Sequence, residues 1–419
     1  MTETGSRFPA GPAGGTGRLT ALDGIRALAA LAVLVYHVAV ETGAALHDGF
    51  LGALLSRGDV AVPVFFTLSG FLLYLPHARA VIEGTAAPRA GAYLLRRALR
   101  ILPAYWLVVA VALPLWSPEH VTDAATWLKL LLLVHVYDPA PWWSGLGPAG
   151  LAQMWSLCVE TAFYLVLPLL AAALAWFAAR KGADPGRRAR RLLTALAAIS
   201  ALSYLWTLLV YYPEYRPHLV TWLPRSATFF TPGMALAVVA VWARREPDGP
   251  AARAVHAVRA SAGTLWLVAG LAYAVAASPV TGPRFLGIDG VWSGLFELAL
   301  YSLVAACLVA PAALLPHAAT PMGRLLATPV LRYLGRVSYG VFLWQFVVLR
   351  AWYSLSGQQP FTGNLVPNLF AVGALTVLLA AVTHHLVEEP FRRLAHRLTS
   401  RRDASVTTSP EPSVPAGAS

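Results

Sequence analysis

The sequence has 419 residues, of which 57% are hydrophobic and only 12% are charged. A soluble domain carries about 25% charged residues, so this composition excludes an ordinary soluble protein and favours a membrane protein. A net charge of +12 would point to nucleic acid in a soluble chain, but here the basic residues have another explanation, and we expect no nucleic-acid partner. The two cysteines lie within apolar runs and predict neither a disulfide framework nor a metal site.

The two ends of the sequence differ from its middle. Residues 1–18 are rich in Gly, Pro and Thr and predict a disordered tail rather than a signal peptide. Residues 399–419 predict a second disordered tail of low complexity. The stretch 19–398 is therefore expected to form one membrane domain.

Long apolar runs within this domain predict an all-α polytopic membrane protein. The apolar segments, in chain order, are 22–42, 60–78, 99–116, 125–137, 151–179, 192–212, 225–243, 262–278, 291–315, 336–356 and 366–388. The segment 125–137 is short and contains Lys129 and His135. Whether it crosses the bilayer decides the orientation of everything that follows it.

The distribution of basic residues answers this question. If 125–137 does not cross, 25 of the 32 Lys and Arg residues fall on the side of the N-terminus. Cytoplasmic loops of membrane proteins carry an excess of Lys and Arg, so this side is predicted to be cytoplasmic. We therefore expect about ten transmembrane helices plus one short re-entrant or interfacial helix, in the cell membrane, with both termini cytoplasmic.

The first apolar segment contains Arg26 and, eleven residues later, His37. A charge inside a lipid-facing segment costs several kcal/mol, so such residues are candidates for function. Eleven residues turn a helix by roughly 1100°, which returns both side chains to nearly the same face. They are expected to lie about 16 Å apart along the axis, Arg26 near the cytoplasm and His37 near the outside.

The predicted topology puts three more polar residues in the outer layer with His37, namely Glu160, Glu297 and Arg225. A histidine beside a carboxylate can act as a general base toward a hydroxyl, with either glutamate orienting the ring. The alternative for His37, Glu160 and Glu297 is a structural role, as a hydrogen bond between helices.

The inner layer is predicted to contain Arg26, Arg97 and Arg100. Arg97 and Arg100 are three residues apart and share one helix face. Guanidinium groups match phosphate oxygens, so this group suits a phosphorylated ligand. The alternative is that these arginines only anchor the helix at the cytoplasmic surface.

The residues together resemble the acyltransferase-3 family of integral membrane O-acyltransferases, over about Leu22 to Arg393. The motifs that carry the resemblance are Leu22-Asp-Gly-Ile-Arg26 through Tyr36-His37, Phe65-Phe-Thr-Leu-Ser-Gly-Phe-Leu72, Arg97-Ala-Leu-Arg100 with Pro103 and Tyr105, Trp155-Ser-Leu-Cys-Val-Glu160 with Phe163-Tyr164 and Pro168, Leu334-Gly-Arg-Val-Ser338-Tyr339 with Leu343-Trp344, and Glu388-Glu389-Pro390-Phe391. Each motif is weak by itself, but all six in order are specific.

The resemblance implies ten spans and transfer of an acyl group from cytoplasmic acyl-CoA to a hydroxyl, usually on a carbohydrate. It implies that His37 is the catalytic base or a transient acyl carrier and that Glu160 supports catalysis. Arg26, Arg97 and Arg100 would bind CoA. Acyl-CoA is then a co-substrate, and no permanently bound cofactor is expected. Some members carry an extracytoplasmic hydrolase-like domain; none is predicted here, so the membrane unit or a separate partner would complete the transfer.

The remaining candidates are assigned to acceptor binding or support, and one of them departs from the family. These candidates are Asp23, Ser69, Arg225, Glu297 and Gln345. The Ser-Tyr…Leu-Trp motif often ends in His, but this sequence has Gln345, which hydrogen-bonds but does not titrate. We hypothesise that this residue contacts the acceptor and alters its choice.

The leading function is an O-acyltransferase that moves an acyl group, acetyl in first place, from acyl-CoA to a carbohydrate or glycosylated small molecule. The alternative is a transporter or flippase of a lipid-linked glycan or glycosylated metabolite, because ten spans and buried charge serve either. A transporter would have no reason to bind CoA, so CoA binding separates the two. A pure scaffold explains the buried charges poorly.

Overall fold

The structure, a computed structural model, describes residues 20–179, 184–284 and 290–407, with side chains to residue 399. All regular secondary structure in these residues is helical. The α-helices are α1 (Thr20–Glu41), α2 (Phe50–Leu55), α3 (Ala61–Glu83), α4 (Ala90–Trp116), α5 (Ala124–Leu131), α6 (Trp155–Ala179), α7 (Pro185–Tyr211), α8 (Leu223–Arg245), α9 (Pro250–Ala260), α10 (Ala262–Ala276), α11 (Val291–Leu314), α12 (Pro321–Leu326), α13 (Pro329–Ser356), α14 (Leu365–Thr383) and α15 (Glu389–Thr407).

The long helices confirm a polytopic membrane protein. In the described residues, eight helical stretches are long and apolar enough to cross a bilayer. The helices α9 and α10, bent by 74° where they meet, form a ninth if the pair is one span. Helix α13 has 28 residues, about 42 Å, which is also long enough, although its Arg and Gln side chains lower its hydropathy. The predicted count of about ten is compatible with this set.

The segment predicted not to cross is short. It folds as α5 and a single 3₁₀ turn, His135–Tyr137. Eight residues of α-helix extend only about 12 Å, far less than the roughly 30 Å hydrocarbon core. Helix α5 is tied to α4, because the Tyr105 hydroxyl donates to the carbonyl oxygen of Leu130 at 2.7 Å.

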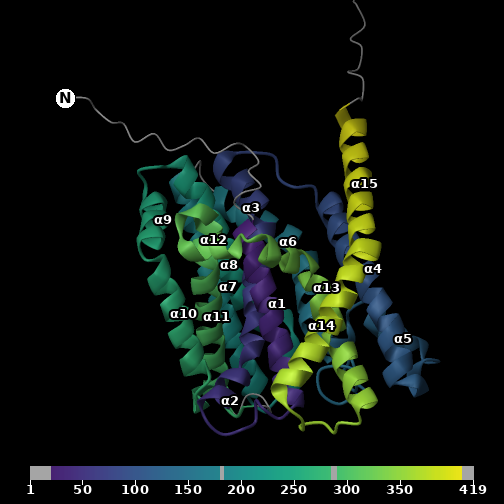
Figure 1. The fold of residues 1–419 in the computed structure, drawn as a ribbon. Helices are drawn as coiled ribbons and strands as arrows, with labels where there is room; N and C mark the ends of the chain where they lie inside the picture. The colour runs from purple at the N-terminus through teal and green to yellow at the C-terminus, as the bar shows by residue number, and fades with distance from the viewer. Residues whose placement is uncertain (1–19, 180–183, 285–289, 408–419) are drawn as a thin grey trace, which may run out of the picture.

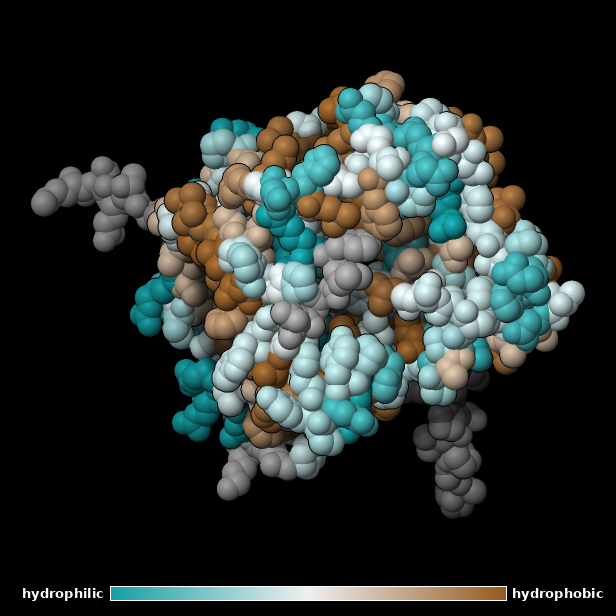
Figure 2. All heavy atoms as spheres, turned by 90° about the horizontal axis from the view of Figure 1, so that it is seen from below, coloured by the Kyte–Doolittle hydropathy of each residue, from teal (hydrophilic) through white to brown (hydrophobic). Residues whose placement is uncertain are grey.

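The bundle has two different ends (Figure 1). One end, which we call the basic end because of its arginines, carries the start of α1 and α13, the end of α3 and α8, and the helices α9, α12 and α15. The loop end carries α2 and α5 (Figure 1). Seen from the loop end, hydrophilic residues spread over much of the face, with hydrophobic residues between them and at the rim (Figure 2).

Helix α3 lies at the centre and packs closely against α8. A Cβ atom added to Gly233 would lie 1.8 Å from the carbonyl oxygen of Thr67, so only glycine permits this approach. A Cβ atom added to Gly70 would lie 2.2 Å from the carbonyl oxygen of Phe230. The Thr67 hydroxyl donates to the carbonyl oxygen of Phe229 at 2.7 Å. Small residues and interhelical hydrogen bonds are how helices associate in lipid, where burial of apolar surface drives little.

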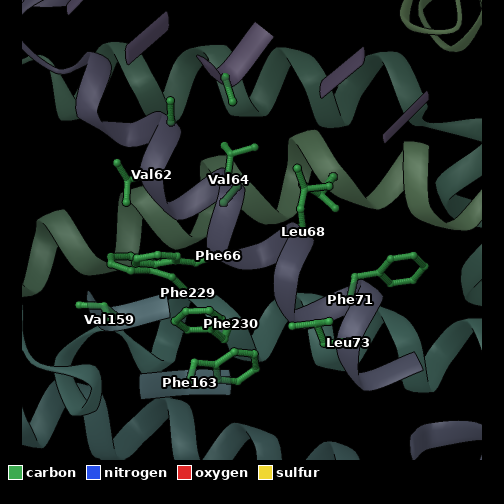
Figure 3. Packing of buried hydrophobic residues seen from close by; sticks show 14 of the residues in the cluster. Val62, Val64, Phe66, Leu68, Phe71, Leu73, Val159, Phe163, Phe229 and Phe230 are labelled. Atoms are coloured by element: carbon green, nitrogen blue, oxygen red, sulfur yellow. The ribbon is translucent and has the colours of Figure 1, made fainter. Parts of the chain in front are cut away.

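Aromatic side chains extend this contact to α6. The Phe230 ring stacks between Phe66 of α3, at a centroid distance of 4.5 Å, and Phe163 of α6, at 4.0 Å (Figure 3). Stacked aromatic pairs contribute about 0.5–1.5 kcal/mol beyond their buried area. The stack fixes the spacing of α3, α6 and α8.

Helix α1 is held against α13 at the basic end. A Cβ atom at Gly335 would lie 2.0 Å from the carbonyl oxygen of Asp23, so the two backbones touch there. The motif Leu334-Gly therefore has a packing role that brings α13 beside the first turns of α1.

Several helices extend further than the apolar segments predict. Helix α4 begins at Ala90 and not at residue 99, because Arg and Leu favour helix and the helix continues beyond the hydrocarbon layer. Helix α15 likewise continues to Thr407, beyond the predicted domain boundary at residue 398, through a run rich in Arg and Leu. The predicted N-terminal tail 1–18 and the last part of the C-terminal tail, 408–419, lie outside the described residues.

Candidate active site

A cavity of about 360 Å³ lies between α1, α3, α4, α6 and α13. Along α3 its wall runs from Val62 to Leu73, eleven residues or about 16 Å of helix. The α3 side of the wall is mostly apolar, whereas the basic end is polar. The polar lining residues are Arg26, Ser69, Arg97, Arg100, Ser156, Glu160, Tyr164, Ser338 and Tyr339.

Three arginines from two helices meet at the basic end of this cavity. Arg97 and Arg100 of α4 both line it, as their spacing of three predicts, and Arg26 of α1 lies in the same wall. The Arg26 guanidinium is 3.5 Å from the carboxylate of Asp23. Three cations therefore face one lining carboxylate, Glu160, and the excess positive charge favours an anionic ligand.

Arg97 has unused capacity for hydrogen bonding. Its guanidinium lies over the Tyr164 ring, 5.9 Å from the centroid. Its Nε is buried and has no hydrogen-bond partner within the described part of the chain. A buried donor without a partner costs about 1–3 kcal/mol, which a bound acceptor would recover.

Glu160 joins two walls of the cavity. One of its carboxylate oxygens accepts a hydrogen bond from the Ser69 hydroxyl of α3 and one from the Tyr164 hydroxyl of α6, both at 2.5 Å. Hydrogen bonds to an ionised carboxylate are about twice as strong as neutral ones. Glu160 thus fixes α3 and the middle of α6 around the ligand space.

His37 lies beyond the opposite end of the cavity. Its Nδ1 is 3.1 Å from Oε1 of Gln345, and the ring packs at 4.3 Å from the Phe346 ring and 5.0 Å from the Tyr36 ring. It is half-buried and is not part of the cavity wall. Phe342 does line the cavity, one helical turn before Gln345.

The predicted pairing of His37 with a carboxylate is wrong, because Glu160 lies deeper than its segment indicates. The chain has already entered the bundle when α6 begins at Trp155. The Gln153 side chain, just before α6, donates to the carbonyl oxygen of Leu343 at 3.0 Å, close to the level of Gln345. Glu160 is seven residues further on, about 10 Å toward the arginines.

Arg225 and Glu297 form a separate pair. Their side chains are 3.2 Å apart, between α8 and α11, and only 6% and 14% exposed. Neither lines the cavity. The residues predicted to share one outer layer therefore lie in separate places: Arg225 pairs with Glu297, and His37 pairs with Gln345.

The structure brings six of the ten predicted site residues together at the basic part of the cavity. They are Asp23, which orients Arg26, and the lining residues Arg26, Ser69, Arg97, Arg100 and Glu160. The sequence gives no role to Tyr164, Tyr339 or Phe342, which also line the cavity. Tyr164 and Tyr339 do fall within the quoted motifs, which is the signal by which they could be found.

Comparison with known proteins finds a protein family that this chain matches. The model of an acyltransferase domain, Acyl_transf_3, matches residues 19–385. Peptidoglycan O-acetyltransferase OatA of Listeria monocytogenes is 24% identical over 388 residues, which cover 89% of this chain and 55% of that protein. A Bacillus subtilis protein named "Putative peptidoglycan O-acetyltransferase YrhL" is 25% identical, over 91% of this chain and 56% of its own length.

This chain spans only about half the length of these curated relatives. No solved structure matches it. The family match covers most of the chain, and its helices are those of a multi-pass membrane protein. The chain therefore belongs to the acyltransferase-3 family.

Proposed function

We propose that this protein is a membrane O-acyltransferase that moves an acyl group from acyl-CoA to a hydroxyl of a carbohydrate or glycosylated small molecule. Acetyl is the first candidate, since the relatives are named as O-acetyltransferases. The observation that carries the proposal is the cavity, which has three arginines at one end and His37 beyond the other. The partner of His37, Gln345, follows the lining residue Phe342 by one helical turn.

The arginine end suits the phosphates of CoA. Guanidinium groups donate in a planar fork that matches two phosphate oxygens, and the buried Nε of Arg97 adds a donor. The apolar wall along α3, from Val62 to Leu73, would hold the pantetheine arm. In this pose the thioester reaches toward Phe342 and His37.

The proposed chemistry uses the imidazole of His37. As a base it takes the proton of the acceptor hydroxyl while the oxygen attacks the thioester carbonyl carbon. The new C–O bond forms, the C–S bond breaks, and the CoA thiolate receives that proton. As an acyl carrier, the imidazole nitrogen attacks the thioester carbonyl first and CoA leaves as the thiolate. The acceptor oxygen then displaces the ring, and the proton of the acceptor hydroxyl ends on the CoA thiolate.

The other predicted residues support these steps. Glu160 would hold Ser69 and Tyr164 in the shape that the donor requires, and Asp23 would orient Arg26. A role for Arg225 and Glu297 in binding the acceptor, or in supporting its binding, stays a prediction. The excess of basic residues at the basic end favours a cytoplasmic position for it, in the cell membrane, so that donor enters there.

A transporter or flippase is the weaker alternative. It would use the same number of spans, but it would have no reason to bind CoA, and the relatives are named as O-acetyltransferases. The direct test is incubation of the purified, detergent-solubilised protein with radiolabelled acetyl-CoA and a panel of peptidoglycan fragments and glycosides. Transfer or hydrolysis of the label supports the enzyme. If the protein neither binds acetyl-CoA nor turns it over, the result supports the transporter.

The arginines provide a sharper test. We expect Arg97→Ala to raise KM for acetyl-CoA by about 10- to 100-fold, because a hydrogen bond to a charged group contributes about 1.5–3 kcal/mol. The matched control is Arg96→Ala, which removes the same charge one residue earlier on α4 but does not line the cavity. Steady-state kinetics with both variants measure the difference.

Acetyl-dephospho-CoA, which lacks the 3′-phosphate, shows which arginine contacts that group. Wild-type protein should prefer acetyl-CoA, and the variant that removes the contact should lose the preference. The same experiment applies to Arg26→Ala and Arg100→Ala. Wild-type KM in all three variants would contradict a phosphate site here.

A further inference from the structure

Gln345 is the hydrogen-bond partner of His37, and both of its amide atoms are engaged. Its Oε1 is 3.1 Å from Nδ1 of His37. Its Nε2 donates to the carbonyl oxygen of Phe342 on the same helix, α13, at 3.2 Å. The side chain is buried, at 1% exposed, so no bulk water competes for these bonds.

These two bonds determine the direction of the amide group. A backbone carbonyl oxygen only accepts hydrogen bonds, so the atom of Gln345 that faces Phe342 must be the NH₂ nitrogen. The reverse orientation would bring two oxygens together without a proton between them. The amide oxygen therefore faces His37.

The amide orientation in turn determines the tautomer of His37. An amide oxygen also only accepts, so Nδ1 of His37 must carry the hydrogen. A neutral imidazole has one N–H, which leaves the lone pair on Nε2. The hydrogen bond from the second ring nitrogen is the usual way in which proteins set the reactive nitrogen of a histidine.

We propose that Gln345 is a positioning residue that keeps neutral His37 in the Nδ1–H tautomer and so makes Nε2 the base or nucleophile. The proposal rests on the function proposed above, in which His37 performs the chemistry. It replaces the hypothesis that Gln345 acts by contacting the acceptor.

The tautomer can be measured without any activity. The full chain, labelled with ¹⁵N in its histidine rings and held in detergent micelles, gives ring nitrogen signals that distinguish Nδ1–H from Nε2–H. The His37 signals are those that disappear in His37→Ala. We expect Nδ1–H in the wild-type protein at a pH where the ring is neutral, and Nε2–H would overturn the proposal.

Two variants of Gln345 test whether this residue sets the tautomer of His37. Gln345→Met keeps the length but offers no strong acceptor, so Nε2–H or a mixture should appear and kcat should fall about 10- to 100-fold, within the range that general-base catalysis provides. KM for the donor should stay within about twofold, since Gln345 does not line the cavity. Gln345→Glu presents an oxygen to Nδ1 in either protonation state, so it should restore Nδ1–H and most of kcat.

The matched control is Gln153→Met. Gln153 is also buried and also donates to the backbone of α13, at Leu343 and more weakly at Phe342, but within the described residues it is not a hydrogen-bond partner of His37. This variant should leave the His37 signals unchanged. Unchanged Nδ1–H in folded Gln345→Met would overturn the proposal; if that variant does not fold, the wild-type signals and Gln345→Glu decide.

Failure of the two proposals can be told apart. If His37→Ala retains transfer, the proposed function fails, whatever tautomer is measured. If His37→Ala is inactive but Gln345→Met keeps the wild-type tautomer and kcat, only the role of Gln345 fails.

Discussion

Replacement of His37 by alanine is expected to lower kcat for acetyl transfer by at least about 10²–10⁴-fold, the range that a general base contributes. The loss would be greater if the imidazole carries the acyl group, since no other route to the intermediate would remain. KM for acetyl-CoA should change little, because His37 lies outside the cavity that the arginines line. Initial rates with radiolabelled donor measure both constants.

The control is His47→Ala, which removes an exposed imidazole from the loop between α1 and α2 at the same end of the bundle. It should retain wild-type activity. Incubation with labelled acetyl-CoA in the absence of acceptor then separates the two mechanisms: label bound to wild-type protein but not to His37→Ala indicates an acyl carrier. Full activity of His37→Ala would refute both.

Replacement of Gly233 by alanine is expected to destabilise the bundle by about 3 kcal/mol, at the upper part of the range for overpacking. The added Cβ would lie 1.8 Å from the carbonyl oxygen of Thr67 and 2.7 Å from the amide nitrogen of Phe71. Both are backbone atoms, so no side chain can rotate away and α3 must separate from α8. The hydrogen bond from Thr67 and the Phe66–Phe230 stack would weaken as well.

The melting temperature in detergent measures this effect. A maleimide dye that fluoresces on reaction with thiols reports unfolding, because Cys158 and Cys307 are 1% and 7% exposed. The control is Gly270→Ala on α10, where an added Cβ meets nothing within 4 Å and alanine favours helix by about 1 kcal/mol. Equal melting of the Gly233→Ala and wild-type proteins would contradict the close approach of α3 and α8.

Much of the fold could be predicted because lipid imposes strong rules on sequence. Apolar runs of about 20 residues must be helices, since the bilayer offers no other partner for the backbone. The short helix α5 could be predicted because 125–137 is too short and because its crossing would divide the basic residues between both sides. The start of α4 and the end of α15, which lie beyond the apolar runs, could not be predicted, since that rule does not apply outside the hydrocarbon layer.

The candidate site was predictable where its residues share one helix or where the topology puts them at the same end, as it does Arg26 with Arg97 and Arg100. Arg97 and Arg100 line the cavity together because their spacing of three fixes a common face. Glu160 was assigned to the wrong neighbours, because the depth at which α6 begins depends on how residues 138–154 fold into the bundle. Gln345 lies 308 positions from its partner His37 in the sequence, and no periodicity links the two residues, so their contact could not be predicted.

The sequence by itself determined that this chain is a membrane helix bundle, that Arg26 and His37 are eleven residues apart on one helix, and that its motifs resemble one family. These properties follow from local geometry and from the cost of charge in lipid. Only the tertiary structure decided that Glu160 faces the arginines, that Arg225 pairs with Glu297, and that His37 pairs with Gln345. Depth and partners depend on close contacts between helices, such as Gly233 with Thr67, which bring together residues that are distant in the chain.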